Sequence, residues 1–263
     1  MEMTDIHFSK WQGTGNDFII LDGRTKQFGN LSEEIIKKLC DRHFGIGADG
    51  LMILMNHPDL DFKMMYFNAD GIEAEMCGNG ARCMIGFAYQ LGIIAEKTSF
   101  MAYDGIHAGR VLGEDKYQIK MIDVKEFKKA DKHYFLNTGV PHLIVFIDDV
   151  DKVNMVEEGR MYRHSPEFSP EGTNVNFVQL VGNTIKMRTY ERGVENETLS
   201  CGTGAVASAI ATYLETNKKQ TSFTCKVPGG QLKVTFEHLS SGKFCNIFLE
   251  GPAKQVFEGI LKF

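Results

Sequence analysis

One short pattern occurs twice in this chain, and the repeat limits the folds that the chain can adopt. Cys77-Gly78-Asn79-Gly80-Ala81 recurs 124 residues later as Cys201-Gly202-Thr203-Gly204-Ala205. Three further matches share this offset, the last with a one-residue insertion or deletion: Thr14-Gly15 with Thr138-Gly139, Asn68 with Arg192, and Lys63-Met64 with Lys186-Met187. Several matches at one spacing indicate a duplication, and hence two similar halves related by a pseudo-twofold axis. Two copies with so long a period do not fit a solenoid. A chain of 263 residues with 43% hydrophobic content is long enough for two cores.

The segment after each repeated cysteine has the pattern of a buried helix. Apolar residues fall at helical spacing from Ala81 to Leu91 and from Val206 to Leu214, and Gly92 suits the end of the first helix. No charged residue lies between positions 83 and 91 or between 202 and 214. Both helices are therefore expected to be central and wrapped by sheet. A third helix is predicted over Leu31–Cys40, where Ser32 can act as the N-cap.

Charge and hydropathy exclude several classes of partner. The 29 basic and 34 acidic side chains give a net charge of −5 without long blocks of either sign, so nucleic acid is not an expected partner. The apolar runs Leu51–Met55 and Leu143–Ile147 are too short to span a bilayer and suit buried strands. The first five residues have neither a basic nor an apolar region typical of an export signal. We expect a cytoplasmic protein with no membrane partner.

The six cysteines are expected to be reduced, because a chain of this length without an export signal does not need disulfides. No Cys-x-x-Cys and no suitable histidine spacing is present, so no metal site is predicted. Four of the cysteines lack a glycine-rich helix start after them and are interpreted as structural: Cys40, Cys83, Cys225 and Cys245.

The two repeated cysteines precede helix starts, where free backbone N–H groups and the positive end of the helix dipole lie together. Such a position lowers the pKa of a thiol and binds anions such as carboxylates. If the pseudo-twofold axis brings the two helix starts together, the amides of four residues could hold one carboxylate, with a thiol on either side: Gly78, Asn79, Gly202 and Thr203.

Two thiols that flank one carbon suit the inversion of a stereocentre. One thiolate removes a proton from one face, and the partner thiol delivers a proton to the other. The charge that develops spreads into the carboxylate, where fixed amide donors stabilise it. The alternative is that both cysteines are small core residues at helix starts.

Polar residues elsewhere are candidates for binding a substrate. Arg192 in Glu191-Arg192-Gly193 could grip a carboxylate with two donors. The alternative is an ordinary surface ion pair between Glu191 and Arg192. Asn16, Asn68 and Asn174 could likewise be turn residues.

A set of motifs, in this order, resembles the diaminopimelate epimerase family across essentially the whole chain. They are Gly13-Thr14-Gly15-Asn16-Asp17-Phe18, Gly45-Ile46-Gly47-Ala48-Asp49-Gly50, Phe67-Asn68-Ala69-Asp70-Gly71, Cys77-Gly78-Asn79-Gly80-Ala81-Arg82, Pro141-His142, Gly172-Thr173-Asn174-Val175-Asn176-Phe177, Glu191-Arg192-Gly193-Val194, Cys201-Gly202-Thr203-Gly204 and Gly251-Pro252-Ala253.

The resemblance implies an α/β (α+β) fold with two pseudo-symmetric domains, each a curved, mostly antiparallel sheet around a central helix. The N-terminal domain would span 1–125, with a strand at 254–263 returning to it, and the C-terminal domain 126–253, with the site in the cleft between them. The implied reaction interconverts LL- and meso-2,6-diaminopimelate for lysine and peptidoglycan synthesis, without pyridoxal phosphate or metal. A homodimer is also implied.

Residue roles follow from the same resemblance. Cys77 and Cys201 would be the acid and base, and the amides of Gly78, Asn79, Gly202 and Thr203 would hold the reacting carboxylate. His142 and Glu191 would tune the cysteines. The substrate's amino groups and distal carboxylate would be bound by Asn16, Asn68, Asn174, Glu191 and Arg192.

Three positions depart from the family pattern. Val140 replaces a common Asn, Gly50 stands where some members have a substrate-contacting Gln, and Phe257 stands where some have a Tyr linked to dimerisation. Two alternatives remain open: a proline- or hydroxyproline-type racemase, and a non-catalytic or thiol-redox protein in which Cys77 and Cys201 form a disulfide. A substrate without a distal carboxylate would have no use for Arg192, which argues against the first.

Overall fold

A computed structural model describes residues 5–25, 28, 31–131, 133–216 and 220–262. Residues 1–4, which bear on the expectation of a chain without an export signal, and Phe263, the last residue of the predicted returning strand, lie outside the described residues. The chain divides into two compact units. Unit 1 comprises Met1–Ile119 and Gly251–Phe263, and unit 2 comprises Lys120–Glu250.

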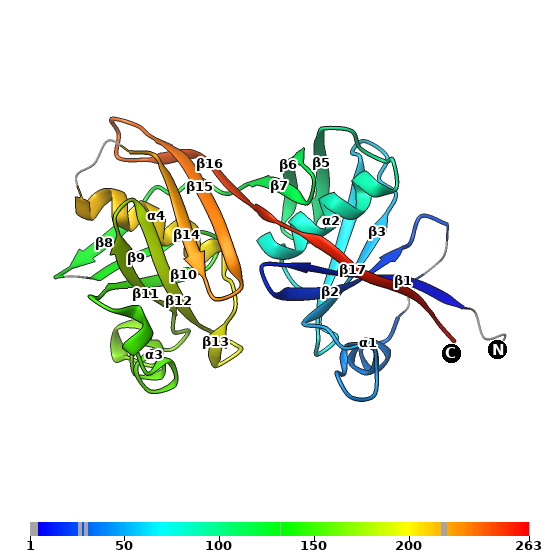
Figure 1. The fold of residues 1–263 in the computed structure, drawn as a ribbon, viewed down its shortest axis with the longest axis horizontal. Helices are drawn as coiled ribbons and strands as arrows, with labels where there is room; N and C mark the ends of the chain where they lie inside the picture. The colour runs from blue at the N-terminus through cyan, green and yellow to red at the C-terminus, as the bar shows by residue number, and fades with distance from the viewer. Residues whose placement is uncertain (1–4, 26–27, 29–30, 132, 217–219, 263) are drawn as a thin grey trace. The chain divides into compact units, whose positions relative to one another are not determined.

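Unit 1 contains eight strands and two helices among its described residues (Figure 1). The strands are β1 (Ile6–Gly13), β2 (Asn16–Asp22), β3 (Gly50–Met55), β4 (Phe62–Asn68), β5 (Lys97–Ala102), β6 (Gly105–Gly113), β7 (Lys116–Lys120) and β17 (Lys254–Leu261). The helices are α1 (Glu33–Cys40) and α2 (Gly78–Gln90). The Ser32 side chain caps α1 by accepting from the Ile35 amide, as predicted.

Unit 2 likewise contains two α-helices among its described residues, together with nine strands and two short 3₁₀ turns. Its strands are β8 (Phe127–Ala130), β9 (His133–Asn137), β10 (Pro141–Phe146), β11 (Asn174–Val181), β12 (Thr184–Glu191), β13 (Asn196–Thr198), β14 (Ser222–Val227), β15 (Gly230–His238) and β16 (Phe244–Pro252). The helices are α3 (Met155–Arg163), α4 (Gly202–Thr216) and the short 3₁₀ turns η1 (Val150–Lys152) and η2 (Pro166–Phe168). Unlike α2 and α4, α3 is not among the predicted helices.

The order of strand pairings is the same in the two units. In unit 1 the pairs β1–β2, β2–β3, β3–β4, β4–β5, β5–β6 and β6–β7 are antiparallel, parallel, antiparallel, parallel, antiparallel and antiparallel. In unit 2 the pairs β9–β10, β10–β11, β11–β12, β12–β14, β14–β15 and β15–β16 follow the same sequence. Chance does not reproduce six pairings in order, so the duplication inferred from the sequence extends to the sheet.

The register also repeats at the offset of 124 residues. Phe18 pairs with Gly50 in unit 1, and His142 pairs with Asn174 in unit 2. In the next antiparallel pair of strands, Met52 opposes Tyr66 in unit 1 and Asn176 opposes Thr189 in unit 2. Met52 and Asn176 keep the offset of 124 residues, whereas Tyr66 and Thr189 show the one-residue shift seen in the sequence. Structurally equivalent positions can therefore be assigned residue by residue.

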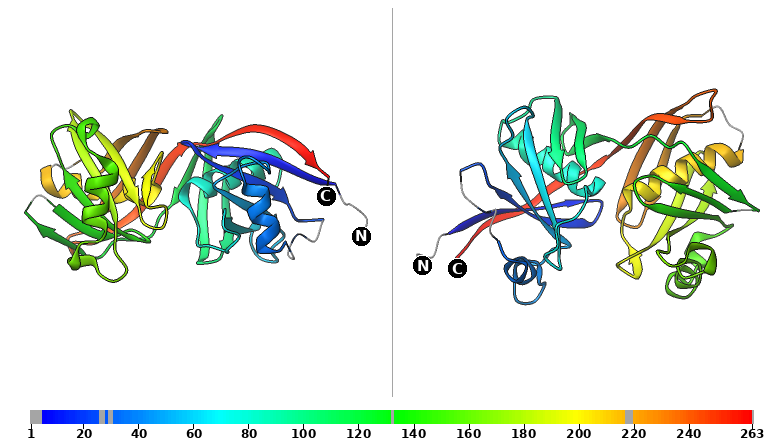
Figure 2. Two further views of the ribbon diagram at one scale, coloured as in Figure 1. Left: turned by 90° about the horizontal axis from the view of Figure 1, so that it is seen from below. Right: turned by 180° about the vertical axis from the view of Figure 1, so that it is seen from behind.

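Each sheet curves around one helix, which confirms the predicted fold class (Figures 1 and 2). Helix α2 contacts β1, β2, β3, β6 and β17, and α4 contacts β9, β10, β11, β12, β14 and β15. The approach is close: a Cβ atom on Gly86 of α2 would lie 2.6 Å from the Trp11 ring. The residues of α2 from Gly78 to Ala88 are buried, and most of α4 is buried too, as their apolar sequences predict.

The unit boundaries differ from the predicted limits of 125/126 and 253/254, and backbone hydrogen bonds explain the difference. The Met121 and Val124 amides donate to the carbonyls of Ile247 and Phe244 in β16, which attaches this segment to unit 2. The Ala253 amide donates to the Asp115 carbonyl, which attaches the start of the returning segment to unit 1.

Candidate active site

Cys77 and Cys201 occupy equivalent positions at the amino ends of α2 and α4. The Cys77 carbonyl accepts from the Ala81 amide at 2.7 Å, and the Cys201 carbonyl accepts from the Ala205 amide at 3.0 Å. Each cysteine is therefore the last residue before its helix, with an extended backbone in the case of Cys77. The first amides of each helix lack intrahelical acceptors and carry the positive end of the dipole. These amides include those of the predicted carboxylate-binding residues, Gly78, Asn79, Gly202 and Thr203.

In unit 1, Asn16 lies beside the Cys77 thiol. The Sγ atom of Cys77 is 3.6 Å from Oδ1 of Asn16, and Nδ2 of Asn79 donates to the same oxygen at 3.3 Å. Nδ2 of Asn16 donates to Asp49 at 2.6 Å, which fixes which way the amide faces. The structure thus brings together three of the predicted site residues of unit 1.

Asp49, which accepts the hydrogen bond from Asn16, belongs to a network of charged side chains. Asp17 is bonded to Lys10 at 2.7 Å and to Arg42 at 2.7 Å, and Arg42 also bonds Asp49. Burial alone would raise the pKa of the Asp17 carboxyl, but the hydrogen bonds from Arg42 and Lys10 outweigh burial and lower it to about 2. The two acidic residues were not predicted to have a role, although they belong to the motifs around Asn16 and Gly50.

Arg82 is a second residue whose role was not predicted. Its side chain is fully buried, and its guanidinium donates to the oxygens of Gly78, Asn79 and Thr14 at 2.8–3.3 Å and to the Pro252 carbonyl at 3.4 Å. Burial lowers the pKa of Arg82, because the charged form is desolvated. All four acceptors are neutral, so a positive charge is buried at the base of the Cys77 half-site. The equivalent position in α4 is Val206.

In unit 2, a line of buried polar side chains leads to Cys201. Oγ1 of Thr203 is 3.5 Å from the Cys201 Sγ and 2.9 Å from Nε2 of His142, and Nδ1 of His142 is 3.0 Å from Nδ2 of Asn176. The Gly204 amide also donates to Cys201 Sγ at 3.4 Å. Complete burial, with the nearby charge of Arg192, lowers the pKa of His142 to about 3, so the imidazole is neutral at ordinary pH.

Asn174 holds Arg192 in place through the backbone. Its Oδ1 accepts from the Arg192 amide at 2.8 Å, and its Nδ2 donates to the Pro141 carbonyl at 3.1 Å. Next along β12, a carboxylate oxygen of Glu191 accepts from the Thr198 hydroxyl at 2.8 Å. The backbone of Arg192 is thus positioned by a buried amide side chain.

Asn68 lies at the end of β4, where the Tyr66 hydroxyl donates to its Oδ1 at 2.8 Å. The same tyrosine explains why glycine is found at position 50. A Cβ atom on Gly50 would lie 2.7 Å from the Tyr66 ring and 2.6 Å from the Phe67 carbonyl. A larger residue at position 50 would collide with the side chain that orients Asn68.

Three of the other four cysteines, Cys40, Cys83 and Cys225, are buried. Burial raises the pKa of Cys40 to about 11 and that of Cys225 to about 12, and it raises the pKa of Cys83 further. Thiols of this kind stay protonated and unreactive, which agrees with the structural interpretation of these three cysteines; Cys245 is only partly buried. None of the six cysteines is disulfide-bonded.

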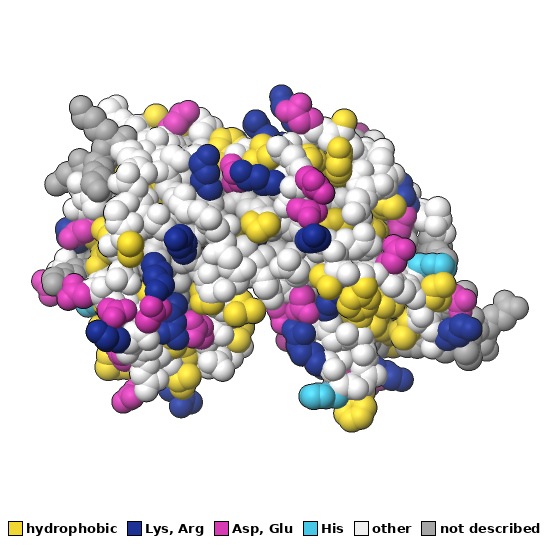
Figure 3. All heavy atoms as spheres, in the orientation of Figure 1, with side chains coloured by type: hydrophobic (Ala, Val, Ile, Leu, Met, Phe, Trp, Pro, Cys, Tyr) yellow, Lys and Arg dark blue, Asp and Glu magenta, His cyan; other side chains and the backbone are white. Residues whose placement is uncertain are grey.

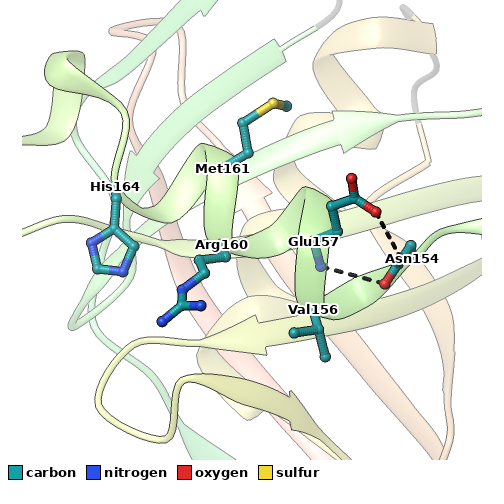
Figure 4. A pocket seen from close by; sticks show the side chains of 6 residues that line it. All are labelled: Asn154, Val156, Glu157, Arg160, Met161 and His164. Atoms are coloured by element: carbon teal, nitrogen blue, oxygen red, sulfur yellow. Dashed lines mark hydrogen bonds between the residues drawn. The ribbon is translucent and has the colours of Figure 1, made fainter.

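A surface depression lies over α3 of unit 2, and no cysteine lines it. Figure 4 shows its lining side chains, Asn154, Val156, Glu157, Arg160, Met161 and His164, and Asn154 among them caps the helix by accepting from the Glu157 amide. None of these residues was a candidate from the sequence. In the part of the chain that the structure describes, no helix is long and apolar enough to cross a membrane.

The comparisons with known proteins agree with this geometry. The diaminopimelate epimerase family model matches residues 8–121 and 134–256, which include every site residue named above. The chain belongs to this family. It is 48% identical to the diaminopimelate epimerase of Flavobacterium psychrophilum over 95% of this chain and 97% of that protein, and 42% identical to that of Aquifex aeolicus over 97% and 98%. Family membership makes the chain an epimerase, an isomerase that inverts one stereocentre.

Solved structures share the family's fold at low identity. A PhzF-family protein of Bacillus anthracis superposes with a TM-score of 0.79 at 15% identity, covering 98% of this chain and 99% of that one. A hydroxyproline epimerase of Agrobacterium vitis has a TM-score of 0.68 at 14% identity, covering 100% of this chain and 92% of that one. At such identities the likeness concerns the fold alone.

Proposed function

We propose that this epimerase interconverts LL- and meso-2,6-diaminopimelate with Cys77 and Cys201 as its two acid/base groups. The observation that carries the proposal is the equivalence of the two thiols. Each stands at the amino end of the buried helix of its own unit, in units with the same strand pairings. Inversion of a stereocentre needs one proton-transfer group for each face, and a duplicated thiol supplies two.

The reacting carboxylate is proposed to bind the backbone amides of Gly78, Asn79, Gly202 and Thr203 at the two helix starts. A helix N-terminus favours an anion through these N–H groups and the dipole. As the α-proton leaves, negative charge moves from the α-carbon into the carboxylate. Donors already fixed at those oxygens stabilise the charge without reorganising, which lowers the barrier.

The proton transfers follow from the protonation states of the pair. One cysteine begins as thiolate and takes the α-proton, and the other begins as thiol and gives its proton to the opposite face. The product state has the two roles exchanged, so the enzyme works in both directions. The titrations of the two thiols are coupled, because only one of them is charged at a time. This chemistry requires both half-sites to act on one substrate molecule.

The remaining polar residues are proposed to bind the amino groups and the distal carboxylate of the substrate. Arg192 offers a planar, two-donor grip for the carboxylate, and its backbone is held by Asn174. Asn16 and Asn68 are each oriented by a neighbour, Asp49 and Tyr66 respectively. Glu191 completes this set, and together with His142 it is proposed to tune the cysteine pair.

The wider role proposed is cofactor-independent synthesis of a lysine and peptidoglycan precursor in the cytoplasm, without pyridoxal phosphate or metal. The two units would be the epimerase domains expected at 1–125 with 254–263 and at 126–253. A homodimer is proposed through β17, where Val256, Phe257 and Ile260 are about half exposed. Hydrophobic side chains gather on this part of unit 1 (Figure 3), and Phe257 packs edge-on against Phe8.

The first test is a direct assay of the purified protein on LL-diaminopimelate without added cofactor. Cys77→Ala and Cys201→Ala should each abolish epimerisation and leave the fold intact, since neither thiol can reach the face served by the other. Cys245→Ala, at a partly exposed cysteine outside both half-sites, is the matched control and should keep wild-type turnover. Turnover above a few per cent in either active-site mutant would contradict the two-base mechanism.

A second test asks whether the two thiols meet. Diamide accepts two electrons and two protons when it joins two thiols, and it should inactivate the enzyme by linking Cys77 to Cys201. Substrate should protect, and dithiothreitol should restore activity. Peptide mapping that found only links among the other four cysteines would refute the facing arrangement. A reversible disulfide in a protein without epimerase activity would instead favour the thiol-redox alternative.

A further inference from the structure

Unit 2 buries three polar side chains in a row behind Cys201. His142 and Asn176 are fully buried, and Thr189 is nearly so. Thr189 donates its hydroxyl to Oδ1 of Asn176 at 2.9 Å, and Asn176 in turn meets His142 and the Leu143 carbonyl. Buried polar groups are costly unless each one is bonded, so a connected row of them requires a reason.

The direction of each hydrogen bond follows from the Leu143 carbonyl, which can only accept. The atom of Asn176 that faces it at 3.2 Å must therefore be the nitrogen, Nδ2, and this assigns the amide orientation. The same Nδ2 faces Nδ1 of His142, so Nδ1 must be the unprotonated nitrogen that accepts. The proton of the neutral ring then lies on Nε2, which donates to Oγ1 of Thr203.

The tautomer of His142 also determines which hydrogen bond the sulfur of Cys201 receives. Because Thr203 Oγ1 accepts from His142, its own hydroxyl proton is free to point at Cys201 Sγ, 3.5 Å away. A hydroxyl donor stabilises a thiolate more than a thiol, since hydrogen bonds to charged groups are the stronger ones. The order of donation is Asn176 to His142, to Thr203, to Cys201.

The fold itself does not require polar residues at these positions. The equivalents in unit 1 are Phe18 for His142, Met52 for Asn176 and Tyr66 for Thr189, as the strand pairings show. A Cβ atom on Gly80 would meet Met52 and Phe18, whereas one on Gly204 would meet Asn176, so both sets lie beneath their helix starts. The same cavity beneath the helix can thus be filled with apolar side chains.

We infer that Asn176 is a positioning residue, which holds His142 as the Nε2–H tautomer and so directs the Thr203 hydroxyl onto the Cys201 sulfur. The inference deepens the proposed two-cysteine mechanism, and it assigns this support to Cys201 alone. In unit 1, Asn16 and Asn79 surround Cys77 instead. Complete burial and, after it, the positive charge of Arg192 lower the pKa of His142 and keep the ring neutral, and Cys201 is reached from the ring through Thr203.

The tautomer can be measured without turnover. In the wild-type protein labelled with ¹⁵N-histidine, the His142 signals, assigned by their loss in His142→Gln, should show a protonated Nε2 and an unprotonated Nδ1 across neutral pH. A protonated Nδ1, or an imidazolium, would overturn the inference. The result does not depend on epimerase activity, so its failure is distinguishable from failure of the proposed mechanism.

Asn176→Asp removes the donor with almost no change in size. A carboxylate at this position accepts from Nδ1, so the neutral ring becomes the Nδ1–H tautomer and its bare Nε2 draws the Thr203 hydroxyl away from the sulfur. Iodoacetamide labelling of Cys201, mapped by peptide, should then fall about tenfold relative to wild type above the pKa of His142. The ratio of mutant to wild-type labelling rates should return towards one at lower pH, because the protonated ring donates from Nε2 again.

Cys77 and a surface asparagine serve as controls. Labelling of Cys77 should be unchanged in Asn176→Asp, and Asn246→Asp, the same change at an exposed site of unit 2, should affect neither cysteine. An equal loss at both cysteines, or a ratio independent of pH, would show a merely structural effect and refute the inference. If Asn176→Asp does not fold, Thr203→Val and Thr203→Ser decide: the first should slow Cys201 labelling about tenfold, and the second should restore it. Equal labelling in the two would refute the inference.

Discussion

Arg192 shows how a single residue acquires a role from its neighbours. A lone arginine after a strand is more often part of a surface ion pair than of a binding site. Here the buried Asn174 side chain holds its backbone amide at 2.8 Å. This hydrogen bond fixes the backbone from which the Arg192 side chain extends, and so would reduce the conformational freedom lost on binding the proposed distal carboxylate.

For Arg192→Lys, we expect kcat/KM on diaminopimelate to fall about 10- to 100-fold, because the ammonium keeps the charge but loses the two-donor grip. Steady-state kinetics in both directions would measure the loss. Arg188→Lys, on the strand β12 that precedes Arg192, is the matched control. Arg188 pairs with Glu197, so its replacement should affect stability more than catalysis. Unchanged kinetics in Arg192→Lys would favour the alternative function of a proline- or hydroxyproline-type racemase, whose substrate has no distal carboxylate.

Asp17 links the Cys77 half-site to the stability of unit 1. The folded pKa of Asp17 is about 2, against an ordinary value of 3.8. Its contribution to stability is therefore complete above pH 3.8 and is lost as the pH falls towards 2. The shift corresponds to about 2 kcal/mol at neutral pH. Urea unfolding should show Asp17→Asn destabilised by this order at pH 7 and nearly equal to wild type near pH 2. The more exposed Asp22, paired with Arg24, offers a control with a smaller effect.

The residues whose roles were missed share a physical reason. The positions of Cys77 and Cys201 before helix starts could be predicted because a Gly-x-Gly follows each one in the sequence itself. In the sequence, Arg82 resembles any charged residue on the surface of a helix. Only the folded structure shows that its side chain is fully buried. Asn176 belongs to a quoted motif, but its importance depends on facing His142 across two strands, and strand register is not visible in a single sequence.

At the scale of elements, the two central helices approach their sheets to different degrees at their first turns. A Cβ atom on Gly204 of α4 would lie 2.4 Å from the Asn176 Oδ1 and 3.3 Å from the Cys201 Sγ. A Cβ atom on Gly80 of α2 would lie 3.1 Å from the flexible thioether of Met52. The first neighbour is a bonded amide that cannot move freely, and the second can adjust its rotamer.

Gly204→Ala should therefore cost about 1–3 kcal/mol of stability and slow Cys201 labelling, since the amide and the sulfur must both shift. Gly80→Ala is the matched variant in the other repeat and should be tolerated better. Thermal unfolding and thiol mapping of the two proteins would compare the effects directly. If Gly80→Ala proved the more damaging, the packing described for the two helix starts would be wrong.

Some of the helices and strands could be predicted from the sequence, and others could not. Helices α1, α2 and α4 followed from capping, glycine and apolar spacing. The sequence of α3, Met155–Arg163, is largely polar and buries only Met155 and Gly159, so it has too weak an apolar stripe to be recognised. The mixed parallel and antiparallel order of the strands depends on long-range pairing, which the sequence pattern does not show. Only the 124-residue offset indicated that one half would repeat the other.

At the scale of the whole molecule, the last strand belongs to the first unit. β17 pairs with β1 from Ile6 to Gln12, and Phe257 packs against Phe8. Removal of residues 254–263 should therefore destabilise unit 1 and leave unit 2 largely intact. Hydrogen exchange followed by mass spectrometry should show faster exchange in β1 and β2 peptides, with protection kept in α4. Equal loss of protection in both units would contradict the division into two units.

The path of the chain also sets an order for folding during synthesis. Unit 2 is continuous from Lys120 to Glu250, so a ribosome releases all of it before β17 emerges. Domains generally fold as units while the chain is still being made. Unit 1, although most of it is translated first, waits with an unpaired edge on β1 until the final strand arrives. During that interval the exposed edge is open to pairing with other chains, which makes the first unit to be synthesised the one most in need of protection by chaperones.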